Sequence, residues 1–142
     1  MKISARNVFR GTVRQVQPGA VNAEVTLELP GGQLLVAIVT MESVQQLGIV
    51  EGGEAIALIK APWVMVMTED SGIRLSARNC LKGTVKTVQD GAVNSEVVIA
   101  LDGDSEIKAM VTREAVNELG LHAGAEATAV VKASHVVLGV SS

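Results

Sequence analysis

The chain is one unit written twice. Residues 3–70 align without a gap on residues 75–142, and nearly half of the aligned positions are identical. The best-matched blocks are SARN, which recurs unchanged, GTVRQVQPGAVNAEV against GTVKTVQDGAVNSEV, and LGIVEGGEAIALIKA against LGLHAGAEATAVVKA. A repeat this long is a whole domain rather than a solenoid unit. The sequence therefore predicts two tandem domains, residues 1–69 and 75–142, with a linker at residues 70–74.

Each copy consists mainly of predicted strands. From Val21 to Leu29 apolar and polar residues alternate strictly, which is typical of a strand with one buried face. The turn signals PGG and DGD lead into LLVAIVT and EIKAMVT, which predicts an antiparallel neighbour in each copy. Thr40 and Thr112 can cap a short helix, and two last strands follow it. This order predicts an all-β fold of two tandem OB-like five-stranded barrels, each with a short helix; a β-sandwich is the alternative.

The core has to be built from short aliphatic residues, because Phe9 and Trp63 are the only aromatic side chains. Such residues bury less area each than a ring does. Small domains of this kind are marginally stable alone, and association is the usual remedy. We therefore expect a homo-oligomer.

Charge and cysteine content narrow the partners and the compartment. The formal net charge of −3 and the scarcity of rings argue against a nucleic-acid partner, which would need a basic groove with stacking platforms. A single cysteine, Cys80, excludes an intramolecular disulfide. The opening MKISARNVFRG is charged where a signal peptide needs an apolar run, and the longest apolar stretch, 55–67, contains Lys60 and Pro62. These features predict a cytoplasmic protein without a membrane partner.

The chain offers no recognisable catalytic constellation. Its two histidines, His122 and His135, occur only in the second copy and align with Val50 and Trp63. No cluster has zinc-ligand spacing, and no glycine-rich loop matches a phosphate-binding fingerprint. We expect no catalytic residues, no catalytic cofactor and no enzymatic activity.

The polar residues that both copies share are mostly donors. Each basic residue of the aligned first copy has a basic counterpart: Arg6 and Arg78, Arg10 and Lys82, Arg14 and Lys86, Lys60 and Lys132. Strand periodicity places Ser4, Arg6, Arg10, Thr12 and Arg14 on one face, provided that no bulge intervenes at Gly11. For Arg10 and Arg14 a solvated edge strand is the simpler interpretation. A pocket of donors alone suits a fully deprotonated tetrahedral oxyanion, so sulfate, molybdate or tungstate fit better than phosphate.

The combination SARNVFRGTV…GAVNAEV…LGIVEGG…IKAPWV resembles the Mop family of molybdate-binding domains, and the second copy resembles it equally. The resemblance covers nearly the whole chain. It implies an OB-type fold, a cytoplasmic location, and binding of molybdate, with tungstate possible, for molybdenum storage or homeostasis. It also implies six domains in one assembly, and hence a homotrimer of two-domain chains.

The resemblance also implies two classes of molybdate site. The class between subunits would use Ser4, Arg6, Thr40, Lys60 and Ala61, with Ser76, Arg78, Thr112, Lys132 and Ala133 in the second copy. The class around a three-fold axis would use Ala20, Val21 and Asn22, with Ala92, Val93 and Asn94. In both classes the protein would bind the oxyanion without direct ligands to the metal. Pro62 lacks an N–H that Ser134 keeps, so the two copies could differ in affinity.

Two other hypotheses stay open on the sequence alone. The first is a non-catalytic regulatory or interaction module of OB fold without a bound oxyanion. The second is a plain turn into the next strand for GAVN, with no role in binding.

Overall fold

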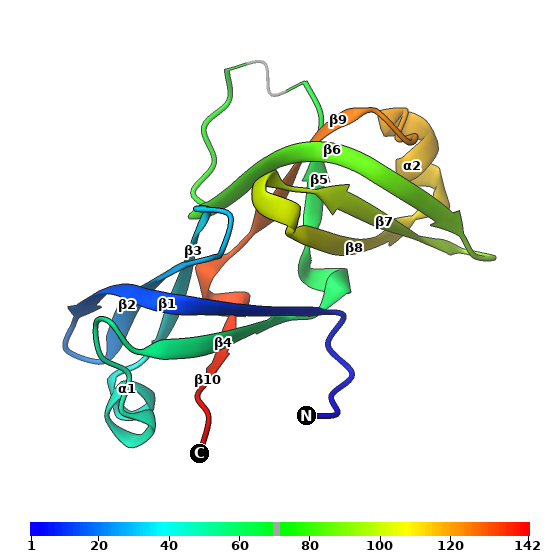
Figure 1. The fold of residues 1–142 in the computed structure, drawn as a ribbon. Coiled ribbons are helices and arrows are strands. Elements are labelled where there is room, and N and C mark those ends of the chain that lie inside the picture. Colours follow the sequence, from blue (N-terminus) through cyan, green and yellow to red (C-terminus); the bar gives the residue numbers. More distant parts are fainter. Residues whose placement is uncertain (70–71) are drawn as a thin grey trace.

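The computed structural model describes residues 1–69 and 72–142 as two lobes, each built around a five-stranded antiparallel sheet (Figure 1). The first copy contains β1 (Asn7–Pro18), β2 (Asn22–Glu28), β3 (Leu34–Thr40), α1 (Met41–Leu47), β4 (Glu54–Ile59), the 3-10 turn η1 (Ala61–Trp63) and β5 (Met65–Met67). The second copy contains β6 (Asn79–Asp90), β7 (Asn94–Ala100), η2 (Asp102–Asp104), β8 (Glu106–Thr112), α2 (Arg113–Leu119), β9 (Glu126–Val131), η3 (Ala133–His135) and β10 (Val137–Gly139). The predicted pair of OB-like barrels, each with a short helix, is confirmed.

The two copies exchange their last strands. The sheet orders are β10-β4-β1-β2-β3 and β5-β9-β6-β7-β8, so each sheet takes one end strand from the other copy. Figure 1 shows β10 beside β4 in the lower lobe and β5 in the upper lobe. The end strands of each sheet also contact each other, β10 with β3 and β5 with β8, so each sheet curls toward a barrel. Neither copy completes its own barrel, a feature that the order of elements along the chain does not reveal.

The predicted domain boundaries describe the sequence repeat, whereas the exchanged strands tie the two lobes together. Part of the predicted linker, residues 70–71, lies outside the described residues.

The alternating pattern of the sequence becomes the core. Ala23, Val25, Leu27 and Leu29 are all buried at 2% exposure or less, whereas Val21, in the turn before β2, is 71% exposed. The equivalent strand of the second copy, β7, repeats this arrangement. The buried faces of the two sheets form one continuous apolar core of short side chains.

The helix boundaries follow their capping residues. Thr40 accepts a hydrogen bond from the Ser43 N–H at 3.0 Å, and Thr112 accepts one from the Ala115 N–H at 3.0 Å. Each helix ends at a glycine in the left-handed conformation, Gly48 with φ 65°. A threonine cap and a left-handed glycine are favoured at these two positions, so the predicted helix is confirmed in both copies.

The expectation that five polar residues share one face of the first strand holds for three of them and fails for Ser4 and Arg6. Ser4 and Arg6 precede β1, which begins at Asn7, and the irregularity in register lies between Val13 and Gln15 rather than at Gly11. Arg10, Thr12 and Arg14 do share the exposed face of β1, because Arg14 forms an ion pair of 3.2 Å with Glu28, the cross-strand partner of Thr12. The alternation reverses only beyond this bulge.

Candidate functional site

The asparagine of each SARN motif joins the two copies. The Asn79 side chain accepts a hydrogen bond from the Val36 N–H and donates one to the Val36 carbonyl, both at 2.8 Å. Asn7 makes the same pair of bonds with the backbone of Lys108, at 2.7 and 2.8 Å. Both amides are buried, at 2% and 3% exposure. Each asparagine therefore provides hydrogen-bond partners for the backbone at the edge of β3 or β8 in the other copy. These bonds also fix the position of the residues that precede the asparagine.

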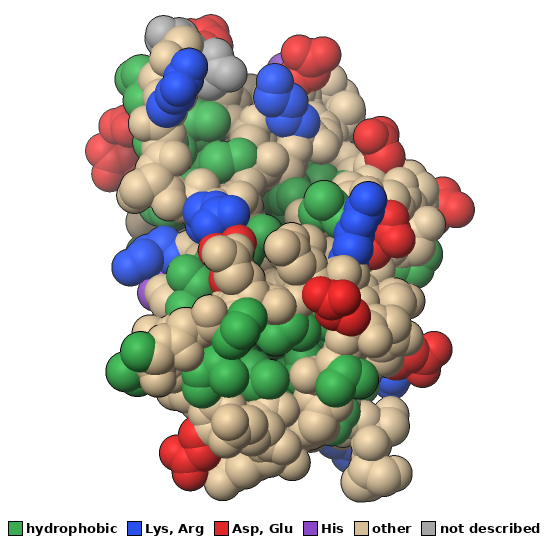
Figure 2. All heavy atoms as spheres, turned by 90° about the vertical axis from the view of Figure 1, so that its left-hand side faces the viewer, with side chains coloured by type: hydrophobic (Ala, Val, Ile, Leu, Met, Phe, Trp, Pro, Cys, Tyr) green, Lys and Arg blue, Asp and Glu red, His purple; other side chains and the backbone are tan. Residues whose placement is uncertain are grey.

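The arginine next to each asparagine forms an ion pair with a glutamate of the other copy. Arg78 makes a bidentate contact with Glu24 on β2, with Nη–Oε distances of 2.6 and 2.9 Å. Arg6 contacts Glu96 on β7 through Nη2, at 2.9 and 3.1 Å. On the face drawn in Figure 2, basic and acidic side chains touch at the level where the two lobes meet. The shared arginines thus lie at the junction of the copies.

The predicted lysines lie beside these arginines. Asn7, the first residue of β1, pairs with Ile59, the last residue of β4. Arg6 comes just before β1 and Lys60 just after β4, so the two residues lie at the same end of the sheet. The turn η1, which begins directly after Lys60, packs on β8 of the second copy. Ala61, in that turn, is buried and has no side-chain donor. The second copy repeats this arrangement, since Asn79 pairs with Val131 and η3 packs on β3.

The two lysines have different surroundings. The Lys60 ammonium lies 5.3 Å from the centroid of the Trp63 ring, within the range of a cation–π contact. The Trp63 ring in turn lies 5.1 Å from the His135 ring, with 33° between their planes. Because Trp63 and His135 occupy equivalent positions of the repeat, their rings meet at the junction of the two lobes. Of the two lysines, Lys60 is the one with the indole ring beside it.

The two threonines lie far from the arginine of their own copy. Arg6 precedes the start of β1, whereas Thr40 pairs with Asn22, just beyond the other end of β1. The 12 residues of that strand separate the two ends by a contour of roughly 36 Å. A single ion could not bridge that length.

Each arginine instead lies near the threonine of the other copy. Glu96, which holds Arg6, pairs with Met110 on β8, and Thr112 is two residues farther along that strand. Such diagonal neighbours are about 7–8 Å apart, within reach of a long side chain. From Asn7 to Arg6 the segment moves along β8 from Lys108 toward Met110, the direction in which Thr112 lies.

These positions lead us to group the predicted residues across the copies. We call Ser4, Arg6, Lys60 and Ala61 with Thr112 the first cross-copy cluster. Its counterpart, the second cross-copy cluster, contains Ser76, Arg78, Lys132 and Ala133 with Thr40, because Glu24 pairs with Ile38, two residues before Thr40. Sequence reasoning missed two pairs of residues, Asn7 with Asn79 and Glu24 with Glu96. Their occurrence at equivalent positions of both copies was the signal that could have identified them.

The GAVN turns lie at the outer ends of the sheets. Ala20, Val21 and Asn22 are exposed, as are Ala92, Val93 and Asn94. The Val21 carbonyl accepts a hydrogen bond from the Met41 N–H at 2.8 Å, so the turn is held against the start of α1. The turn thus lies next to Thr40, and the two predicted classes of site are neighbours in the fold.

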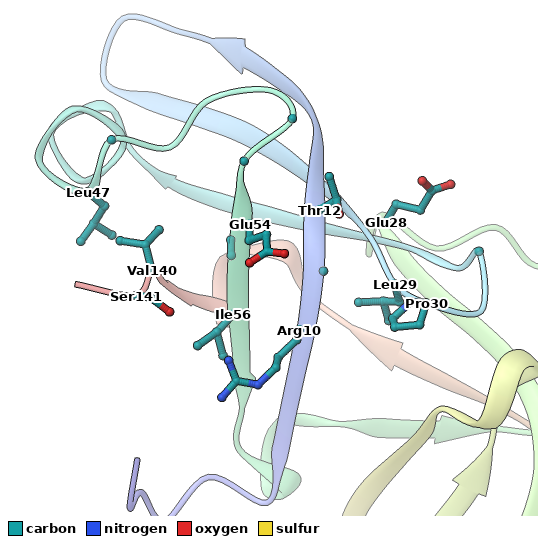
Figure 3. Close-up of a pocket in the computed structure, with 16 residues that line it drawn as sticks. Arg10, Thr12, Glu28, Leu29, Pro30, Leu47, Glu54, Ile56, Val140 and Ser141 are labelled. Carbon is teal, nitrogen blue, oxygen red and sulfur yellow. The ribbon is translucent and has the colours of Figure 1, made fainter.

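A groove in each lobe lies apart from these residues. In the first lobe Arg10 from β1, Glu54 and Ile56 from β4, and Val140 after β10 line it, as Figure 3 shows. The matching groove of the second lobe is lined by Lys82, Gly83, Thr84, Glu126 and Thr128, among others. Neither groove includes a predicted site residue. Each groove mixes acidic with basic side chains.

Other chemistry has little support in the part of the chain that the structure describes. There, no group of three or more His, Cys, Asp or Glu side chains could hold a metal ion. None of the helices in residues 1–69 and 72–142 has the length and apolarity needed to cross a membrane. Cys80 is exposed.

Comparison with known proteins decides the family. The model of the TOBE domain matches the chain twice, at residues 3–66 and 75–138. The chain belongs to the TOBE domain family. Both copies match over almost their whole length, so the repeat seen in the sequence is a repeat of this domain, and the resemblance to Mop proteins is confirmed.

Among curated relatives, the molybdenum-pterin-binding protein MopA of Rhodobacter capsulatus is 44% identical over 140 residues, covering 99% of this chain and 53% of MopA. The molybdenum transport protein ModE of Herbaspirillum seropedicae is 42% identical over the same length, covering 99% of this chain and 52% of ModE. The chain thus spans about half the length of these two relatives. Molybdenum-pterin-binding protein 1 of Clostridium pasteurianum matches 47% of the chain with 98% of its own length, at 43% identity.

The chain is also similar to a solved structure along its whole length. That structure is the cytoplasmic molybdate-binding protein ModG with molybdate bound. The two chains are 61% identical, with a TM-score of 0.97 over 99% of this chain and 100% of ModG. The tandem arrangement of the barrels is therefore shared with a molybdate-binding protein.

Proposed function

We propose that this protein binds molybdate, and tungstate in its place, as a cytoplasmic protein of molybdenum storage and homeostasis. The observation that carries the proposal is the similarity to molybdate-bound ModG, at 61% identity over the full length of both chains. The protein acts by binding and release, with no catalytic step. Its relatives with printed functions are binding proteins, transport proteins and a transcriptional regulator.

The cross-copy clusters supply the chemistry for the first class of site. Each brings a guanidinium, an ammonium and a serine hydroxyl from one copy toward a threonine of the other. Arginine presents a planar fork of donors that matches two oxygens of one anion, and lysine adds a second positive charge. A tetrahedral dianion accepts from all of these groups. Each chain thus brings two such clusters, both divided between its lobes, to the subunit interfaces at which the ions are held.

The GAVN turns supply the second class of site. Their residues are exposed at the end of each lobe, and Val21 and Val93 are each 71% exposed. Large apolar side chains on turn tips are suited to contact with another chain. We propose that three chains meet there around a three-fold axis, so that the backbone donors of Ala20–Asn22 and of 92–94 are each repeated three times.

Two features support the trimer. The core is made of short aliphatic side chains, with Phe9 and Trp63 the only rings. Figure 2 shows apolar side chains gathered on the lower half of one face, which belongs to the first lobe. Native mass spectrometry should give three times the chain mass. A monomer at micromolar concentration, with and without molybdate, would contradict the trimer.

The binding function is tested by equilibrium dialysis against molybdate, tungstate, sulfate and phosphate in physiological salt. We expect saturable uptake of molybdate and tungstate, with weaker uptake of sulfate and phosphate. No saturable molybdate uptake, or equal uptake of sulfate, would refute the proposal.

A further inference from the structure

Two glutamate carboxylates form ion pairs with the arginines of the cross-copy clusters. Glu24 holds Arg78 with two hydrogen bonds of 2.6 and 2.9 Å, and Glu96 holds Arg6 at 2.9 Å. The same pair occurs at both junctions of the copies, each time joining the start of one copy to the outer face of the other.

These two ion pairs differ from the other two salt bridges among the described residues. The carboxylate side chains of Glu96 and Glu24 are 17% and 27% exposed, whereas Glu28 and Glu106 are 47% and 38% exposed. The pairs of Glu28 and Glu106 join residues within one copy. Charges that are more shielded from water interact more strongly with their neighbours. Glu24 and Glu96 are therefore placed to influence an ion at the arginines.

A carboxylate and a dianionic oxyanion compete for the same donors. A tetrahedral oxyanion needs the fork of Nη donors that Glu24 now accepts from Arg78. An oxyanion that instead used the remaining Nε edge would lie beside a negative charge. In either arrangement the carboxylate opposes binding, by occupying the arginine or by repelling the ion.

We propose that Glu24 and Glu96 are competing carboxylates that lower the affinity of the two cross-copy clusters for oxyanions. They hold Arg78 and Arg6 in the ion-free protein and give way when a dianion binds. This inference rests on the proposed function and adds the groups that limit affinity. It also ties binding to the junction of the lobes, because each carboxylate that is displaced breaks an ion pair between the copies.

The size of the effect follows from the charges. A monoanion and a dianion about 7 Å apart, at an effective dielectric constant of about 30–60 between those of water and a protein surface and in physiological salt, repel each other enough to weaken binding about three- to tenfold. Removing the carboxylate charge should tighten binding by the same factor. Glutamine has nearly the shape of glutamate, so the change tests charge rather than packing.

The experiment is titration calorimetry with molybdate on the full chain carrying Glu24→Gln and Glu96→Gln together. We expect affinity about three- to tenfold tighter than wild type, with the same number of ions bound. The matched control carries Glu28→Gln and Glu106→Gln, which removes the same charge from sites about 13 Å farther along the same two antiparallel ladders. The control should stay within about twofold of wild type, because salt screens charges at that distance.

Unchanged or weaker molybdate binding in the Glu24→Gln, Glu96→Gln variant would overturn the inference while wild-type binding upholds the proposed function. If the variant loses phosphate binding and its molybdate binding is unchanged, the carboxylates accept a hydrogen bond from a protonated ion. That result would also overturn the inference. Absence of molybdate binding by wild type would overturn the proposed function itself. If the double variant does not fold, each single variant should tighten only about half of the cluster sites, and unchanged single variants would refute the inference.

Discussion

Replacing Asn79 with alanine should lower the free energy of unfolding substantially, although Asn79 lies outside the predicted site. The change removes two hydrogen bonds of 2.8 Å and leaves the Val36 N–H and carbonyl without these partners at a partly buried edge. A net hydrogen bond contributes about 0.5–1.5 kcal/mol, and a buried group left unsatisfied costs about 1–3 kcal/mol. We expect a loss of about 2–4 kcal/mol in total.

The assay is urea denaturation followed by circular dichroism at one fixed protein concentration, since the proposed association would contribute to apparent stability. The matched control is Asn117→Ala, the same chemical change at an exposed position of α2, which should alter stability by about 0.5 kcal/mol or less. A loss for Asn79→Ala no larger than that of Asn117→Ala would refute the view that the SARN asparagine joins the copies. Asn79→Asp separates the two bonds, because a carboxylate still accepts from the Val36 N–H but cannot donate to its carbonyl.

Leu138→Ala, in the exchanged strand β10, should cost about 2–4 kcal/mol and speed amide hydrogen exchange in β4 of the first copy more than in β9; faster exchange in β9 alone would contradict the strand exchange. Gly83→Ala should destabilise the second lobe, because a Cβ there would collide with the Ala100 carbonyl oxygen, and thermal melting checks this; an unchanged melting temperature would show that β6 and β7 can part at little cost. Molybdate should change the fluorescence of Trp63, the single tryptophan, because an anion on Lys60 draws the ammonium from its place 5.3 Å from the ring. Lys60→Met should abolish that change, and a persistent response would place the ion elsewhere.

Much of the fold could be predicted, because the signals are local. Alternation from Ala23 to Leu29 gives the buried face of β2, and Thr40 with Gly48 delimits α1. The strand exchange could not be predicted in the same way. Met65–Met67 reads as a strand whichever lobe it joins, and its choice of β9 depends on contacts distant in sequence.

The candidate site, like the fold, has one part that could be predicted from the sequence and one part that could not. The repeat singled out Arg6 and Lys60, and the resemblance added Thr40 and Thr112. Sequence reasoning assigned each threonine to its own copy, since nothing in the order of residues tells which end of β1 faces which lobe. The bonds of Asn7 to Lys108 and of Arg6 to Glu96 supply that information, since they direct Arg6 toward the copy that carries Thr112.

The central claim is that each oxyanion site is divided between the copies, and counting the bound ions in two double variants tests it most directly. Equilibrium dialysis gives the number of molybdate ions per chain, with Arg6→Ala, Arg78→Ala as the reference that lacks both arginines. If Arg6 and Thr112 serve one site, Arg6→Ala, Thr112→Ala should lose half of the ions that the reference loses. Arg6→Ala, Thr40→Ala should lose all of them, because its two changes fall in different clusters. The reverse result would contradict the account and return each threonine to the arginine of its own copy.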